Sequence, residues 1–268
     1  SKAFTFLSIP STVTNIGDGA FANARYVKFE GQIPPTIGSN AFNDSSNGTK
    51  FFVSQGAIET FRNTKNINEA YVYYHGELSN NNQYFVYDYG EGYGISYFIN
   101  SVSVGSSITI PNNITKSSVT KPVTALGYNS YRNLNTAATG TKITIPNTVS
   151  LIDSYAFYKD NITEINLGEV SKINSYAFYD TKLTTLVSNK LEYIGSYGFY
   201  QNPITYISLP NVDEIMSYAF MNSTTLYEMD LGTVKVIGDK AFYNCPQLGR
   251  VWFSNISTKV VNNGKSID

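Results

Sequence analysis

The segment Ser154-Tyr155-Ala156-Phe157-Tyr158 recurs with small changes along the second half of this 268-residue chain. Its phenylalanine returns at Phe157, Phe178, Phe199, Phe220 and Phe242. By subtraction, the spacings are 21, 21, 21 and 22 residues. A fixed period of this size is typical of a solenoid, because one coil cannot bury its apolar face alone and does so by stacking on its neighbours. The sequence therefore predicts a repeat solenoid.

Two further features repeat with the same period as the phenylalanine. One is an isoleucine, at Ile152, Ile173, Ile194, Ile215 and Ile237. The other is an alternating apolar and polar segment, at residues 163–167, 184–188, 205–209, 227–231 and 249–253. Alternation over about five positions is the period of a half-buried strand. We expect each coil to contribute one short strand to a parallel sheet.

The alternation also predicts which strand side chains enter the core. The inward residues are Ile165, Leu167, Ile207, Leu209, Met229, Leu231, Val251 and Phe253. A proline or glycine such as Pro210 or Gly232 follows most strands and ends them, since neither residue suits a strand interior. The small residue before each phenylalanine, such as Ala156, fits a tight bend, and Ser154 and its equivalents are placed to hydrogen-bond the free amides there.

One segment carries a family resemblance. Residues 9–21 read Ile-Pro-Ser-Thr-Val-Thr-Asn-Ile-Gly-Asp-Gly-Ala-Phe, and residues 231–245 repeat the pattern and end in Ala-Phe-Tyr-Asn-Cys. This pattern resembles the BspA-like leucine-rich repeat family of bacterial surface proteins. The resemblance implies a leucine-rich-repeat-like right-handed superhelix of short parallel strands and turns, mostly β and irregular, with little helix. It also implies secretion or display at the cell surface, where the lone cysteine is acceptable.

The order of segments predicts three units. Residues 1–78 form a first repeat array, with coils closing on Phe21 and Phe42, a strand at 51–53 and a closing helical segment at 56–63 of the kind that the resemblance implies. Residues 79–105 form a tyrosine-rich β-hairpin linker, because Gly90, Gly92 and Gly94 interrupt an apolar stretch. Residues 106–268 form a second array, in which Tyr131 takes the first phenylalanine position.

Composition and spacing disfavour several function classes. Charged residues make up 15% of the chain and the net charge is −1, which gives no basic face for nucleic acid. No apolar run is long enough to span a membrane. Cys245 and His75 lie far apart in the sequence and lack clustered partners, so we expect no metal, no cofactor and no catalytic residue, with Cys245 an inert, partly buried thiol and His75 a surface or edge residue.

Carboxylates and tyrosines offer two further candidates. Glu228 and Asp230 lie two positions apart on one strand, so alternation points both outward, whereas glycoside hydrolysis needs carboxylates that face each other across a cleft. The tyrosines fall into two columns, Tyr155, Tyr176, Tyr197 and Tyr218, then Tyr158, Tyr179, Tyr200 and Tyr243. Stacking of equivalent residues favours a structural ladder. The alternative is an aromatic platform for glycans.

The outward strand positions form the candidate binding surface. They are Glu164, Asn166, Thr185, Val187, Tyr206, Ser208, Glu228, Asp230, Arg250 and Trp252, and all but Val187 are our candidate ligand-binding residues. Solenoids bind on such sheets, and Tyr, Trp and Arg are typical of interaction hot spots. The bland alternative is a solvated sheet on which Trp252 covers the open end of the core. The resemblance favours adhesion to an extracellular protein of a host matrix or a neighbouring cell, with a glycan-binding module and a passive surface spacer as alternatives.

Overall fold

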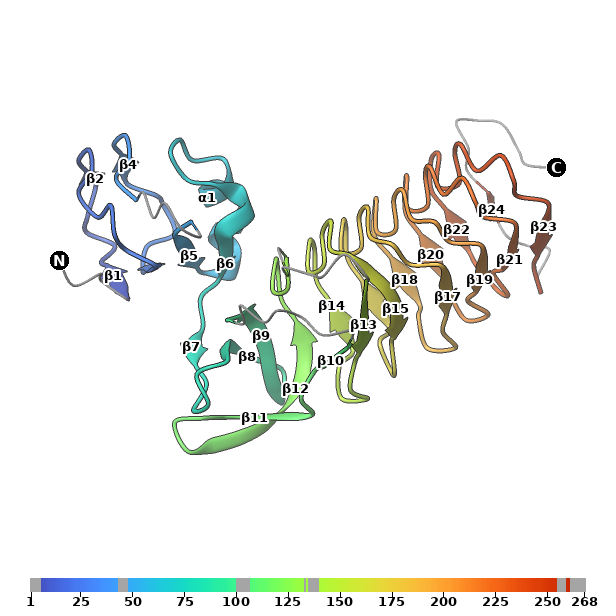
Figure 1. The fold of residues 1–268 in the computed structure, drawn as a ribbon, viewed down its shortest axis with the longest axis horizontal. Coiled ribbons are helices and arrows are strands. Elements are labelled where there is room, and N and C mark those ends of the chain that lie inside the picture. The colour runs from blue at the N-terminus through green and yellow to red at the C-terminus, as the bar shows by residue number, and fades with distance from the viewer. Residues whose placement is uncertain are drawn as a thin grey trace.

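The computed structural model describes residues 6–42, 48–99, 107–132, 134 and 140–254 and the backbone of 259–260. The remaining parts of the predicted units, including residues 1–5, 43–47 and 100–106, lie outside the described residues. A short array at the N-terminal end and a longer one at the C-terminal end are joined by β-hairpins (Figure 1). The predicted solenoid is confirmed. Helix within the described ranges is limited to α1 (Ile58–Arg62) and the 3-10 turns Gln55–Ala57 and Glu69–Tyr71.

The first array contains two parallel sheets. One has the order β1 (Leu7–Ile9), β3 (Tyr26–Phe29), β5 (Lys50–Val53) and β6 (Val72–Tyr74). The other pairs β2 (Asn15–Ile16) with β4 (Thr36–Ile37). Helix α1 closes the core with Ile58 and Phe61, which are both buried. The strand predicted at 51–53 and the helical segment predicted at 56–63 are both present.

The predicted hairpin is also present. It joins β8 (Tyr84–Tyr89) and β9 (Gly92–Phe98) in antiparallel pairing, and Gly90 in its turn has φ 56°. The short strand β7 (Glu77–Leu78) pairs with β8, so the strands on either side of the predicted boundary at residue 78 share one sheet. The division of the chain into three units stays a prediction.

A second hairpin was not predicted. It joins β11 (Asn113–Lys116) to β12 (Val119–Leu126), and the turn residues Ser117 and Ser118 have φ 48° and 66°. Two successive positive φ values define the type I′ turn, for which Asn-Gly rather than Ser-Ser is the usual signal. Strand β12 also pairs in parallel with β9, so hydrogen bonds join the first hairpin to the second array.

Each coil of the second array contributes two strands, which corrects the prediction of one. The first set continues from β12 through β14 (Leu151–Ile152), β16 (Lys172–Ile173), β18 (Tyr193–Ile194), β20 (Glu214–Ile215), β22 (Val236–Ile237) and β24 (Lys259–Val260). The second set comprises β10 (Ser107–Thr109), β13 (Thr141–Thr144) and β15 (Ile162–Asn166), then β17 (Thr185–Val187), β19 (Tyr206–Ser208), β21 (Glu228–Asp230) and β23 (Arg250–Trp252). Two-residue strands are too short to show alternation, so only their isoleucines were visible in the sequence.

The recurring phenylalanines form one stacked column in the core. The column runs through Tyr131, Phe157, Phe178, Phe199, Phe220 and Phe242, with neighbouring ring centroids 5.1 to 5.4 Å apart. Its four middle members are fully buried. Tyr131 therefore occupies a phenylalanine position, as predicted.

The predicted inward strand residues are mostly buried. Leu167, Ile207, Leu209, Met229 and Leu231 are buried, and Ile165 is half-buried. The prediction is wrong for Val251 and Phe253, which are each 39% exposed. Both belong to the coil of β23, which is the edge strand of its sheet, so within the described residues no further strand of that sheet lies beside them.

The tight bend lies two residues before the phenylalanine, at a tyrosine in the coils of Phe157, Phe178, Phe199 and Phe220 and at Lys240 in the coil of Phe242, and not at the small residue. Tyr155, Tyr176, Tyr197 and Tyr218 have φ between 59° and 65°, whereas Ala156 and its equivalents lie in the core. The N–H groups of these tyrosines donate to backbone carbonyls of the next coil; for example, Tyr176 donates to Ser196 at 3.0 Å. The acceptors of the four amides are the backbone carbonyls of Ser175, Ser196, Ser217 and Asp239, where the sequence suggested the side chains of these positions.

Candidate functional site

Seven of the nine candidate residues lie on one sheet. Parallel pairing of β17, β19, β21 and β23 aligns two outward rows. The first row is Thr185, Tyr206, Glu228 and Arg250, and the second is Val187, Ser208, Asp230 and Trp252. We call this surface the β17–β23 face. Adjacent strands lie about 4.8 Å apart, so each row is a ladder of side chains that a partner can contact together.

Exposed side chains lie at both ends of this face. Trp252 is 47% exposed and Val187, at the opposite end, is 62% exposed. About half of the Trp252 surface is therefore open to solvent at the edge strand of this sheet. Arg250 lies 3.7 Å from the Glu228 carboxylate, and its guanidinium lies 5.5 Å from the centre of the Tyr227 ring. The face therefore combines the exposed indole of Trp252 with the guanidinium of Arg250, whose ion pair with Glu228 is long.

Glu164 and Asn166 are separated from the other seven. They lie on β15, which pairs with β13 and belongs to a different hydrogen-bonded sheet. Glu164 forms an ion pair with Lys142 at 2.8 Å, and the Asn166 side chain accepts a hydrogen bond from the Gly168 amide at 3.1 Å. Both side chains therefore have local partners, and Asn166 helps to turn the chain after the strand.

The tyrosine columns form stacked ladders. Rings along the Tyr155 to Tyr218 column are 4.7 to 4.8 Å apart and within 11° of parallel. Tyr158, Tyr179 and Tyr200 stack at 4.9 and 4.5 Å. Tyr243, the fourth predicted member of this column, follows Met221 in the column and is 57% exposed. The ring faces in the middle of each ladder therefore contact other rings, and burial raises the pKa of Tyr179 to about 12. Sugar stacking requires open ring faces, so this packing supports the structural interpretation of the columns.

Several side chains that connect the two arrays were not predicted. The Tyr74 hydroxyl donates to Asp153 at 2.6 Å, and the Asn129 side-chain amide donates to the Val72 carbonyl at 2.9 Å. Burial, together with the Asp153 charge, holds the pKa of Tyr74 well above its usual value. These contacts join residues 57 and 79 positions apart, and no sequence pattern marks them.

Cys245 and His75 lie in different parts of the fold, Cys245 in the last described coils and His75 beside the first array. Cys245 is half-buried, its Sγ lies 3.4 Å from the Phe220 carbonyl oxygen, and burial raises its pKa to about 11. His75 is half-buried beside Lys28, and burial followed by that charge lowers its pKa. Among the residues that the structure describes, no three His, Cys, Asp or Glu side chains group in a way that could hold a metal ion. The described residues also include no helix long and apolar enough to span the bilayer.

The coils, their stacked phenylalanines and their paired parallel strands define a leucine-rich repeat solenoid. The chain belongs to the family described as the BspA type leucine rich repeat region, whose model matches six copies over residues 1–118, 96–227 and 150–264. No curated protein matches the sequence.

The solved structures that match this chain include three leucine-rich repeat proteins. A leucine-rich repeat protein from Bacteroides ovatus is 19% identical, with a TM-score of 0.47, over 66% of this chain and 53% of its own. This chain thus spans about half the length of that protein. A leucine-rich repeat protein of T. pallidum is 16% identical, with a TM-score of 0.45, over 65% of this chain and 87% of its own. A leucine rich cell surface protein of Faecalibacterium prausnitzii is 16% identical, with a TM-score of 0.42, over 94% of this chain and 60% of its own.

Proposed function

We propose that this protein is a non-catalytic interaction module, displayed at a bacterial surface or secreted, that adheres to extracellular proteins through the β17–β23 face. The observation that carries the proposal is the exposed group Tyr206, Arg250 and Trp252 on one sheet surface. Tyr, Arg and Trp dominate the binding energy of protein interfaces, because each buries a large area and can also form a polar contact. Family membership supports a surface interaction role for the whole array.

In the first array, the surface that is equivalent to the β17–β23 face already packs against aromatic side chains of another segment. Ser8, Lys28, Phe52 and Tyr73 occupy a row across β1, β3, β5 and β6. Ser8 precedes Ile9-Pro10 as Ser208 precedes Leu209-Pro210, so this row corresponds to the row that contains Trp252. Phe52 and Tyr73 are nevertheless buried, because Phe85 and Tyr97 of the hairpin pack on them, with ring centroids 4.5 and 4.7 Å apart. The outer face of a coil in this protein therefore accepts aromatic side chains from another segment.

The test is binding of the purified protein to immobilised matrix and serum proteins and, in parallel, to a panel of glycans. The double variant Trp252→Ala, Arg250→Ala should weaken protein capture at least tenfold, since hot-spot residues contribute about 2 kcal/mol or more. Added salt should weaken capture further if Arg250 pairs with a partner carboxylate.

The matched control is Lys235→Ala combined with Tyr243→Ala, which removes an exposed cation and an exposed aromatic ring outside this face. Equal loss in both double variants would contradict the proposed site. Retention by glycans alone would favour the carbohydrate-binding alternative, and binding to neither panel would favour a passive spacer.

A further inference from the structure

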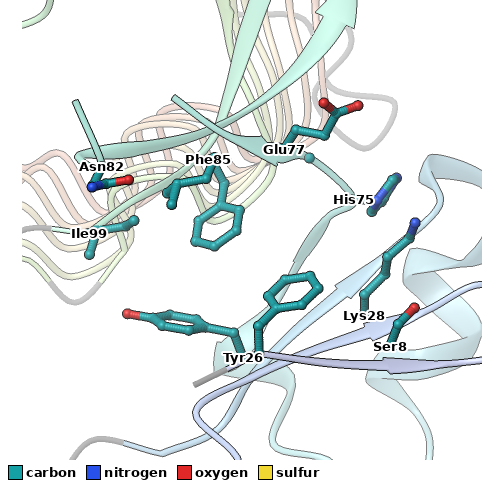
Figure 2. A pocket seen from close by; sticks show the side chains of 11 residues that line it. Ser8, Tyr26, Lys28, His75, Glu77, Asn82, Phe85 and Ile99 are labelled. Carbon is teal, nitrogen blue, oxygen red and sulfur yellow. The ribbon is translucent and has the colours of Figure 1, made fainter. Parts of the chain in front are cut away.

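A groove lies between the first array and the hairpin, away from the β17–β23 face. Its volume is about 590 Å³, within the usual range for sites that bind small molecules. Tyr26 and Lys28 line it from β3, and Phe85 faces them from β8 (Figure 2). Phe6 and Ile99 complete the apolar wall. None of these residues was selected by the sequence analysis.

The groove lies next to the area where the hairpin packs on the sheet of the first array, at the point where the hairpin no longer covers the sheet. Phe85 reaches across the face, packing on Phe52 at 4.5 Å and on Tyr26 at 5.5 Å between ring centroids. Phe6 stacks against the same ring at 6.4 Å. The hairpin buries Phe52 but leaves Tyr26 half-buried and Phe6 48% exposed. The open end of this surface therefore has the aromatic character of the part that the hairpin covers.

One end of the groove is polar, and the charged group that faces the groove there is a cation. The Lys28 side chain extends along the groove toward His75, whereas the Glu77 carboxylate points away from it (Figure 2). Glu77 is drawn toward Lys116, whose ammonium lies 3.7 Å from it. Glu30, outside the lining, accepts a hydrogen bond from Ser8 at 2.8 Å and lies 3.8 Å from the Lys28 ammonium. Lys28 is thus the charged group best placed to meet a ligand.

We propose that this groove binds a small aromatic carboxylate, with its ring against Tyr26, Phe85 and Phe6 and its carboxylate on the Lys28 ammonium. An aromatic ring suits walls that already stack rings, and a charge-assisted hydrogen bond to a half-buried ammonium supplies orientation. This site is distinct from the protein-binding face proposed above and does not depend on it.

The test is isothermal titration of the full chain with three compounds. The first is 3-phenylpropionate, the second is the uncharged 3-phenylpropanol, and the third is butyrate, which has no ring. Saturable binding of 3-phenylpropionate with a Kd below about 5 mM, tighter than that of the other two, is the expected result. Equal binding of 3-phenylpropanol, or no saturable binding of the acid, would overturn the proposal.

Variants locate the site. Lys28→Met keeps the aliphatic stem and removes the charge, so it should weaken 3-phenylpropionate about tenfold and leave 3-phenylpropanol unchanged. Leu78→Trp, which adds bulk at a lining residue that is 41% exposed, should abolish binding of both. Lys142→Met, on an outward position of β13, is the matched control and should bind as the parent does. An unchanged affinity in Lys28→Met would contradict the assignment.

Discussion

Arg62 and Tyr155, 93 residues apart in the sequence, meet where the two arrays join. The Arg62 guanidinium donates to the Tyr155 hydroxyl at 3.3 Å and lies 4.8 Å from the centre of its ring. Arg62 ends helix α1 of the first array, and Tyr155 is the first member of the longer tyrosine ladder. A cation of one array therefore caps the stacked rings of the other, so the junction depends on specific contacts as well as on apolar burial.

We expect Arg62→Met to destabilise the protein by about 1 to 3 kcal/mol. The change removes a cation–π contact and a partly buried charged hydrogen bond, and it leaves Glu59 and Glu69 without the guanidinium that lies 3.1 and 3.2 Å from them. Urea denaturation followed by circular dichroism measures the effect. Lys235→Met is the control, because its exposed ion pair with Asp213 contributes less than about 1 kcal/mol. Equal midpoints for the two variants would contradict this role of Arg62.

At the tyrosine of the bend, we expect glycine to be less destabilising than alanine. Tyr197 has φ 59° and stacks between Tyr176 and Tyr218, at 4.8 and 4.7 Å. Replacement by alanine or glycine removes both stacking contacts, but only glycine adopts a positive φ without steric cost. Tyr197→Gly should therefore be more stable than Tyr197→Ala by about 1 kcal/mol, as measured by urea denaturation.

The matched control uses a neighbouring position with an ordinary backbone. Ala177 is buried and is not among the residues with positive φ, so Ala177→Gly should destabilise by about 0.5 to 1 kcal/mol. A Tyr197→Ala variant at least as stable as Tyr197→Gly would show that the bend is not constrained in solution.

These tyrosines also show where prediction from the sequence stops. The period identified the coils, the phenylalanine column and the outward strand positions, because each depends on a repeat that single residues reveal. The bend was assigned to Ala156, since a small residue is the usual occupant of tight backbone. The structure places Tyr155 there instead. A positive φ is unfavourable for tyrosine, and the stacking of Tyr155 on Tyr176 at 4.8 Å offsets that conformational cost.

Phe199→Ala should have the largest effect on stability. Phe199 is fully buried and stacks on Phe178 at 5.1 Å and on Phe220 at 5.4 Å. Loss of the ring leaves a cavity inside the column, so we expect a loss of about 3 to 5 kcal/mol in the free energy of unfolding. Thermal and urea denaturation measure it. Val187→Ala, at a 62% exposed position, should change stability by less than about 0.5 kcal/mol, and a similar loss in both would show that the core is misplaced.

The candidate site was only partly predictable for a related reason. Alternation placed Tyr206, Arg250 and Trp252 on the exposed side of the sheet without reference to any distant residue. The groove beside Lys28 exists only because Phe85 of the hairpin packs against the first array. That contact joins segments whose separate patterns predict a strand and a hairpin, and neither pattern specifies that one covers the other.

The reactivity of Cys245 tests the packing of the last described coils. Burial raises the pKa of its thiol to about 11, and the same column of earlier coils holds the buried residues Thr181, Asn202 and Ser223. With an unfolded pKa near 9, the thiolate fraction at pH 8 is about a hundredfold smaller in the folded protein. Alkylation by iodoacetamide should be slower by about that factor in native buffer than in urea, and Cys245→Ser should abolish the signal, since the chain has one cysteine.

The pH dependence of this reaction has a defined sign. Because the folded pKa exceeds the unfolded one, the protonated thiol contributes stability that is fully present below about pH 9 and is lost as the pH rises to about 11. The native alkylation rate should therefore keep rising about tenfold per pH unit where the rate in urea has already levelled off near pH 9. A native rate that levels off at the same pH as the unfolded rate would mean that the coil around Cys245 is open in solution.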